Sequence, residues 1–129
     1  MEMSYLFDTN ILVHYLNGSF PQTRLETIDR MLETSFQVSV ISKLELLGWK
    51  GHTAETLELA AAFLSEAVVI PVDLAVADRA LYLKLHYTIR LPDAIIAATA
   101  LETDSTLVTR NTTDMAKIRQ VKVMDPFKL

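Results

Sequence analysis

The feature that most constrains the fold is the alternation of short apolar runs with longer segments of helical periodicity. Runs rich in apolar and β-branched residues predict five strands, at residues 4–8, 36–41, 67–72, 106–109 and 121–124. Helical patterns between them predict seven helices, at residues 9–17, from Pro21 onward, and at 42–49, 53–66, 73–87, 92–103 and 113–118. Strands separated by helices are typical of a parallel sheet covered on both faces. The sequence therefore predicts a single α/β domain over residues 1–129.

The composition limits what such a domain could do. With 129 residues, half of them hydrophobic, the chain can bury one core without disulfides or metals as staples. The absence of cysteine excludes disulfide scaffolds, cysteine zinc sites and thiol catalysis. Twelve Lys and Arg against sixteen Asp and Glu give a net charge of −4, so any nucleic acid would have to be held by a local basic patch or by bound cations.

The apolar character of the chain also predicts partners. A domain this small with a mean hydropathy of +0.25 is expected to keep an apolar surface for a permanent partner. We expect a homodimer formed near the helix at 53–66, where Leu57, Ala60, Ala61 and Leu64 share one face. The N-terminus lacks the basic region of a signal peptide, and no apolar run approaches the length of a membrane span, so we expect a cytoplasmic protein that makes no membrane contact.

Several kinds of catalytic site lack their defining sequence elements. The chain has no Gly-x-Ser-x-Gly, Gly-x-Gly-x-x-Gly or Walker A motif, which argues against α/β-hydrolase, dinucleotide-binding and P-loop proteins. The three histidines, His14, His52 and His86, lack the i, i+4 spacing of a metal-binding pair. They are predicted to be structural or surface groups.

Four acidic residues follow strands or begin helices: Asp8, Glu45, Asp93 and Asp114. In open parallel sheets ligands bind outside the carboxyl ends of the strands, so these acids are expected at one edge. Carboxylates that converge there repel one another unless cations neutralise them. Magnesium takes oxygen ligands, and two such ions could clamp the attacking and leaving oxygens of a phosphodiester.

Each acid also has a purely structural explanation, which the sequence leaves open. Asp8 could cap the helix at 9–17, because Asp is a favoured N-cap residue. Ser42-x-x-Glu45 matches a capping box, in which the glutamate reaches back to the cap amide. Asp93 after Pro92, and Asp114, could be first-turn charges that favour the helix dipole.

Taken together, these segments resemble a known family. Asp8-Thr9-Asn10, Glu45, the stretch LPDAIIAATA at residues 91–100 and the stretch LVTRNTTD at residues 107–114 are similar to the PIN domain. The small bacterial or archaeal form of that domain is similar to VapC, the toxin of type II toxin–antitoxin pairs. The likeness covers essentially the whole chain.

The resemblance implies a doubly wound, three-layer α/β/α fold with a central parallel sheet of about five strands. It also implies an endoribonuclease that depends on one or two Mg²⁺ or Mn²⁺ ions, forms a homodimer and is silenced by a cognate antitoxin. By position, Asp8, Glu45 and Asp93 match the metal-binding acids of the family. Asp114 is taken as the fourth acid, and Asn111 is the alternative, able to orient water or phosphate without adding charge.

Five further residues are assigned supporting roles by the same resemblance. Thr9 and Thr109 are expected to fix a carboxylate or a phosphate through their hydroxyls. The nearest basic candidates for contact with the RNA backbone are Arg110, Lys43 and Arg90.

Two rival readings predict a magnesium-binding domain without nuclease activity. A receiver domain would need paired acids after the first strand and a Lys-Pro pair, and the chain has neither. A PIN-like binding module would have lost or scattered its acids. Divalent-cation-dependent cleavage of RNA separates the nuclease from both.

Overall fold

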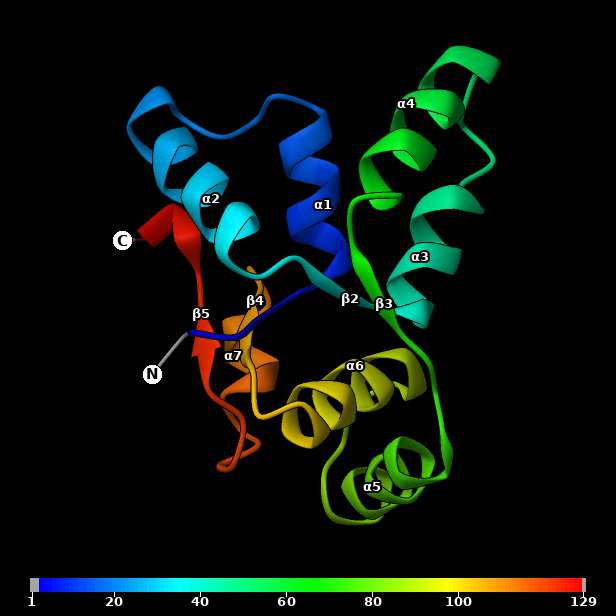
Figure 1. Cartoon of the computed structure of the whole chain (residues 1–129). Helices are drawn as coiled ribbons and strands as arrows, with labels where there is room; N and C mark the ends of the chain where they lie inside the picture. Colours follow the sequence, from blue (N-terminus) through cyan, green and yellow to red (C-terminus); the bar gives the residue numbers. More distant parts are fainter. Residues whose placement is uncertain (1–2, 129) are drawn as a thin grey trace.

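Five short strands form one all-parallel sheet, with helices on both of its faces, in a computed structural model that describes residues 3–128 (Figure 1). Each strand occupies part of a predicted run, and the strand order is β3-β2-β1-β4-β5. The predicted α/β fold with a doubly wound parallel sheet is therefore confirmed. The strands are β1 (Tyr5–Phe7), β2 (Gln37–Ser39), β3 (Val68–Ile70), β4 (Thr106–Val108) and β5 (Val123–Met124).

The first strand lies at the centre of the sheet, between β2 and β4. Its register pairs Leu6 with Leu107 and Phe7 with Val108 on the β4 side. The chain moves outward from β1 through β2 to β3 and then returns to the other side of β1 as β4. Strand order therefore reverses between β1 and β4, and a crevice for ligands is expected outside the carboxyl ends of these two strands.

Seven α-helices connect the strands, in the predicted order. Several begin at capping residues: Asp8, Ser39, Thr53 and Asp73 each accept a hydrogen bond from the first turn of the helix that follows. The helices are α1 (Thr9–Leu16), α2 (Gln22–Thr34), α3 (Val40–Leu47), α4 (Ala54–Leu64), α5 (Leu74–His86), α6 (Leu91–Glu102) and α7 (Thr112–Met115), and a short 3-10 helix, η1, covers Pro126–Lys128.

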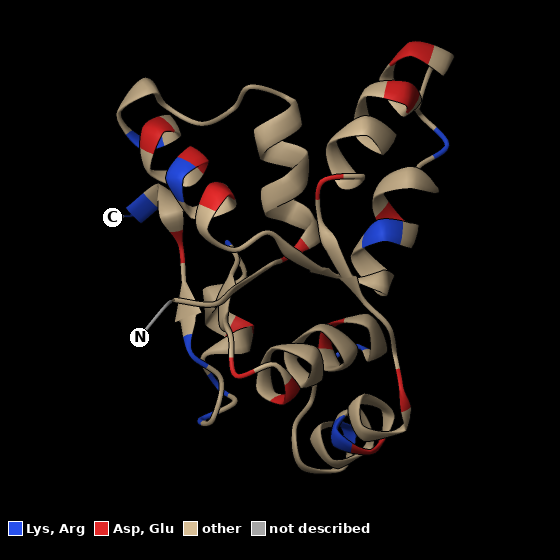
Figure 2. Cartoon of the chain, viewed as in Figure 1, with Lys and Arg blue, Asp and Glu red and all other residues tan. Residues whose placement is uncertain are grey.

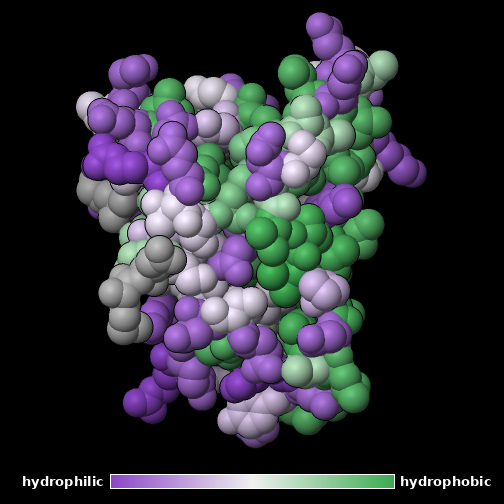
Figure 3. Space-filling model, viewed as in Figure 1, coloured by the Kyte–Doolittle hydropathy of each residue, from purple (hydrophilic) through white to green (hydrophobic). Residues whose placement is uncertain are grey.

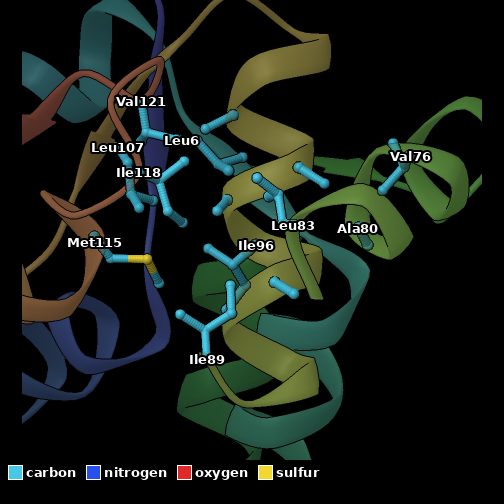
Figure 4. Close-up of a cluster of buried hydrophobic side chains, with 14 residues drawn as sticks. Leu6, Val76, Ala80, Leu83, Ile89, Ile96, Leu107, Met115, Ile118 and Val121 are labelled. Atoms are coloured by element: carbon cyan, nitrogen blue, oxygen red, sulfur yellow. The ribbon is translucent and has the colours of Figure 1, made fainter. Parts of the chain in front are cut away.

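Two hydrophobic cores lie on the two faces of the sheet, because successive side chains of a strand point to opposite faces. Leu6 and Leu107 pack with residues of α5, α6 and the segment after α7 (Figure 4). Phe7 and Val108 pack on the other face with α1, α2 and α4. The small residues of α6 let it lie close to the sheet and to α5, and the fully or almost fully buried ones are Ala94, Ala97, Ala98 and Ala100.

The surface keeps a large apolar component. Figure 3 shows hydrophobic residues gathered over β3 and the beginnings of α3 and α5, where Val68 and Leu74 are 60% and 77% exposed. The predicted partner face of α4 is divided. Ala60 and Leu64 are buried in the core, whereas Leu57 and Ala61 are exposed. No helix within residues 3–128 is long and apolar enough to cross a membrane.

Candidate functional site

The carboxyl ends of β1 and β4 place Asp8 and Thr109 beside each other. Asp8 is only 5% exposed and caps α1, with its Oδ1 accepting the amide hydrogen of Thr9 at 2.7 Å. Its Oδ2 accepts the hydroxyl hydrogen of Thr109, also at 2.7 Å. Asp8 can therefore cap α1 and also belong to a site, because it lies at the carboxyl end of β1, where strand order reverses.

Two of the other predicted acids, Asp93 and Glu45, influence the pKa of Asp8. Burial raises the pKa of Asp8 above its ordinary value, and the nearby charges of Asp93 and Glu45 raise it further. The hydrogen bonds from Thr109 and Thr9 act in the opposite direction, since they stabilise the carboxylate. Figure 2 shows the acidic positions at the start of α1, on α3 and on α6, with no lysine or arginine on α1. Three of the four predicted acids therefore share one electrostatic site.

Glu45 reaches this site from α3. Its Oε1 accepts the hydroxyl hydrogen of Thr9 at 2.7 Å, and the same hydroxyl lies 2.9 Å from that of the fully buried Ser42. The hydroxyl of Thr9 thus links the start of α1 to the carboxylate of Glu45.

The capping-box alternative for Glu45 is wrong. The N-cap of α3 is Ser39, whose Oγ accepts the amide hydrogen of Ile41, so Ser42 lies inside the helix and not before it. The strand that was expected to continue to residue 41 ends at Ser39. Because Glu45 does not cap the helix, its carboxylate is available to the site.

Asp93 lies in the first turn of α6, as its position after Pro92 predicts. Its Oδ2 accepts a hydrogen bond of 3.3 Å from Nε of Arg90, the N-cap residue of the same helix. The pKa of Arg90 is raised by Asp93 above all, and also by Glu45 and Asp8. Arg90, one of the predicted basic residues, thus interacts electrostatically with all three acids.

The loop after β4 is tied to the same site through an amide that the sequence analysis did not single out. Asn10 donates from Nδ2 to Oδ2 of Asp8 at 3.4 Å and to Oγ1 of Thr109 at 3.3 Å. Its Oδ1 accepts the backbone amide hydrogen of Arg110 at 3.2 Å. The backbone amide of Asn111 donates to Oγ1 of Thr109 at 2.9 Å. The Asp-Thr-Asn triplet is the sequence signal that could have identified Asn10.

Two further predicted site residues, Asp114 and Lys43, are exposed. Asp114 is in the first turn of α7, its side chain is 54% exposed, and its Oδ1 lies 3.5 Å from Nζ of Lys117. It is not among the charges that shift the pKa of Asp8. Lys43 is exposed on α3, two residues before Glu45. Electrostatic interactions therefore link Asp8, Glu45 and Asp93, and within residues 3–128 the ion pair of Asp114 is with Lys117.

Two of the three histidines are held by local hydrogen bonds, whereas Nδ1 of His14 is buried without a hydrogen-bond partner within residues 3–128. His52 lies 2.7 Å from the carbonyl oxygen of Leu46 and 3.0 Å from the hydroxyl of Thr56. His86 is bonded to the carbonyl of Tyr82 on its own helix. In residues 3–128 no three His, Asp or Glu side chains stand close enough to ligate one ion without moving. The oxygen donors Asp8, Glu45 and Asp93 nevertheless fit a hard divalent cation, because their mutual repulsion is what such an ion would relieve.

Comparison with known proteins identifies the family and the fold. The sequence matches the PIN domain model over residues 5–121. A comparison with curated proteins finds no match. Among solved structures, a chain of a toxin–antitoxin complex from Klebsiella pneumoniae is 31% identical, with a TM-score of 0.75 over 97% of this chain and 99% of that one.

Other toxin–antitoxin structures share the fold. A chain of DNA-bound VapBC from Salmonella typhimurium has a TM-score of 0.85 at 19% identity, over 96% of this chain and 98% of that one. A chain of FitAcB from Neisseria gonorrhoeae has a TM-score of 0.72 at 25% identity, over 97% and 99% of the two chains. The predicted resemblance is confirmed over nearly the whole length.

Proposed function

This chain belongs to the PIN-domain family, with a fold like that of VapC toxins, and we propose that it is a metal-dependent endoribonuclease serving as the toxin of a toxin–antitoxin pair. One observation carries the proposal: Asp8 is a buried carboxylate whose pKa is raised by burial above all and also by the charges of Asp93 and Glu45, which come from α6 and α3. A cluster of three carboxylates in which Arg90 pairs only with Asp93 is costly in a purely structural protein. The same cluster is useful in a nuclease, where carboxylates bind the cations that contact a phosphodiester.

Asp8, Glu45 and Asp93 would hold Mg²⁺ or Mn²⁺, one ion or two, and the exposed Asp114 would be the outer, fourth acid of the set. When bound, the metal supplies positive charge that polarises the phosphodiester and lowers the pKa of water. Thr109 and Thr9 keep the carboxylates of Asp8 and Glu45 in place through bonds of 2.7 Å.

The remaining residues act on the substrate. Arg90, Arg110 and Lys43 would bind phosphates of the RNA backbone, and Asn111 would orient a phosphate or the attacking water. Glu45, whose second carboxylate oxygen has no hydrogen-bond partner within residues 3–128, would accept a proton from that water. Attack of water on phosphorus with departure of the 3′ oxygen leaves a 3′-hydroxyl and a 5′-phosphate.

The antitoxin would occupy the cavity of about 680 Å³ bounded by α1, α3 and α4. Its walls include Val13, Leu46 and Trp49, and Glu45 stands at its edge. An amphipathic segment with a basic residue at the Glu45 end would match these walls and would cover the acids. A second copy of the chain would instead cover the apolar surface over β3 and α5, forming the homodimer.

The test is cleavage of labelled single-stranded RNA by purified protein. We expect cleavage with Mg²⁺ or Mn²⁺, none with excess chelator, and products that carry 5′-phosphates. A magnesium-binding module without nuclease activity would bind the ion and leave the RNA intact, which would contradict the proposal.

A further inference from the structure

The guanidinium of Arg110, two residues after β4, contacts residues near the C-terminal end of the described chain. The guanidinium carbon of Arg110 lies 4.0 Å from the centroid of the Phe127 ring, in η1. Its Nε lies 3.9 Å from Oδ2 of Asp125, which directly follows β5. Asp125 in turn accepts the backbone amide hydrogen of Phe127 at 2.9 Å. These three residues, Arg110, Asp125 and Phe127, form a unit that we name the C-terminal clamp.

The clamp fixes the position of the guanidinium without using its hydrogen-bond donors. Stacking occupies one face of the planar group, and 3.9 Å is too long for a hydrogen bond to Asp125. Within residues 3–128 the guanidinium of Arg110 donates no hydrogen bond, and its side chain is 42% exposed. Nε faces Asp125, and the N–H donors of the two terminal nitrogens are therefore free for a ligand with several oxygen acceptors.

Asp125 is the unusual member of the clamp. Its side chain is 4% exposed, and its Oδ2 has no hydrogen-bond partner within the described part of the chain. A buried carboxylate with an unbonded oxygen is costly unless a cation compensates its charge. Arg110 is the cation beside it, so the two groups depend on each other.

Phe127 is itself held firmly. Its ring stacks on Phe20, with ring centroids 4.2 Å apart, and meets the edge of His14 at 5.2 Å. The platform under the guanidinium therefore belongs to the hydrophobic core between α1, α2 and η1. These contacts restrict the guanidinium before any ligand binds, which lowers the entropy lost on binding.

The clamp adjoins the acidic site through the backbone. Arg110 directly follows Thr109, the donor to Asp8, and its own amide is bonded to Asn10. The ends of β1, β4 and β5 are neighbours in the sheet, so Arg110 lies between the crevice at Asp8 and the buried Asp125. A phosphate that contacts Arg110 would thus belong to a chain passing the acids.

We propose that Arg110 binds a phosphate of the RNA backbone next to the scissile bond, and that Asp125 and Phe127 are positioning residues that hold its guanidinium for this contact. This inference rests on the proposed ribonuclease function. It predicts that Asp125 and Phe127, which lie more than a hundred residues after Asp8, affect the affinity for RNA.

The test compares variants in Mg²⁺-dependent cleavage of a labelled pool of single-stranded RNA and in equilibrium binding of the same RNA. Arg110→Ala should raise KM roughly tenfold with little change in kcat, because a charge-assisted contact is lost. It should also lower the slope of log binding constant against log salt by about 0.7, the value for one phosphate on a single strand. Arg119→Ala removes the same charge from an exposed residue before β5 and is the matched control.

Asp125→Asn separates positioning from simple electrostatics by the sign of its effect. Removing a negative charge near the site would by itself tighten RNA binding and lower KM. If Asp125 positions Arg110, KM rises instead. Phe127→Leu should raise KM roughly two- to fivefold through loss of the stacked cation, and Phe127→Tyr, which keeps a ring, should restore it. Thermal unfolding of each variant shows whether it is folded, and Asp125→Asn decides the point if Phe127→Leu is not.

The possible failures are distinguishable. If the wild type binds RNA but does not cut it, the proposed function is wrong, and the binding constants still decide the role of Arg110. If the wild type cuts RNA and Arg110→Ala behaves like Arg119→Ala, the phosphate contact is wrong. A lower KM or an unchanged KM in Asp125→Asn overturns the positioning role alone.

Discussion

The hydroxyl of Thr109 donates a hydrogen bond of 2.7 Å to Oδ2 of Asp8, joining two residues 101 positions apart in the chain. The bond crosses from β4 to β1, where strand order reverses. It lowers the pKa of a carboxyl that burial and neighbouring acids raise. One threonine thus reduces the cost of keeping Asp8 charged at the centre of the site.

The first prediction concerns this bond. Thr109→Val keeps the shape of the side chain and leaves a buried carboxylate oxygen without its strongest donor. We expect a loss of about 1–3 kcal/mol in the free energy of unfolding, measured with urea, and a further rise in the pKa of Asp8. Thr99→Val is the control, because Thr99 is equally buried but donates only to the carbonyl of Ile95 in its own helix. Equal losses in the two variants, with no change in the pKa of Asp8, would contradict the prediction.

The second prediction concerns the charge of Asp8 in the absence of divalent ions. The folded-state pKa of Asp8 is raised, so the folded protein prefers the protonated form. Stability from this preference is present below the ordinary pKa of 3.8 and is lost as pH rises through the raised value. Asp8→Asn cannot ionise, and we expect it to be more stable than the wild type at neutral pH in chelator.

Thermal unfolding at a series of pH values measures this difference. The gap between the two proteins should open as pH rises from 3 and should close when Mg²⁺ is added, because the ion stabilises only the protein that binds it. A gap that is independent of pH would show that the substitution acts through packing.

These residues also show how far the sequence alone reaches. The succession of strands and helices, and with it the parallel sheet, follows from alternating patterns, whereas the order of the strands in the sheet was not predicted. Asp8 and Asp93 could be placed at helix starts because Asp, and the pair Pro92-Asp93, are local signals. Glu45 was ambiguous for a local reason. The β-branched Val40 and Ile41 favour a strand, yet Ser39 caps a helix that already contains them, so tertiary structure overrides propensity.

The C-terminal clamp could not be predicted for the opposite reason. Arg110, Asp125 and Phe127 carry no local signal, and their relationship depends on the pairing of β4 with β5. Asn10 is intermediate, since its triplet was visible but its three contacts come from across the sheet. Contacts between distant segments are what a single sequence does not reveal.

The third prediction concerns Tyr15, which lines the apolar groove formed by the cavity between α1, α3 and α4. Tyr15 of α1 stacks on Phe63 of α4, with centroids 5.2 Å apart, and donates its hydroxyl hydrogen to Asp29 of α2. This hydrogen bond raises the pKa of Tyr15 to about 12. The stability it provides is present below pH about 10 and is lost as pH rises through about 12, because the phenolate cannot donate.

Ultraviolet absorbance of phenolate measures this titration, and subtraction of the Tyr15→Phe curve isolates Tyr15. Asp29→Asn should shift the Tyr15 transition to lower pH. We also expect it to weaken binding of an apolar peptide in the groove, since the same tyrosine lines that cavity. A Tyr15 transition at the same pH in Asp29→Asn would show that the hydrogen bond is not its cause.

The last prediction compares two acids in equivalent helix positions. Asp93 and Asp114 both lie in the first turn of a helix, where a carboxylate favours the dipole by about 0.3–1 kcal/mol. Asp93 raises the pKa of Asp8, whereas Asp114 is exposed beside Lys117.

If both acids only served their helices, the asparagine variants would lose similar stability and keep full activity. If Asp93 helps to hold the metal, Asp93→Asn relieves repulsion in the apo protein and lowers RNA cleavage by about two to three orders of magnitude. Asp114→Asn should lower cleavage less. Cleavage rates in Mg²⁺, growth arrest on expression and unfolding in chelator together measure the contrast. Wild-type cleavage by Asp93→Asn would leave the interaction with the helix dipole as the only role of Asp93.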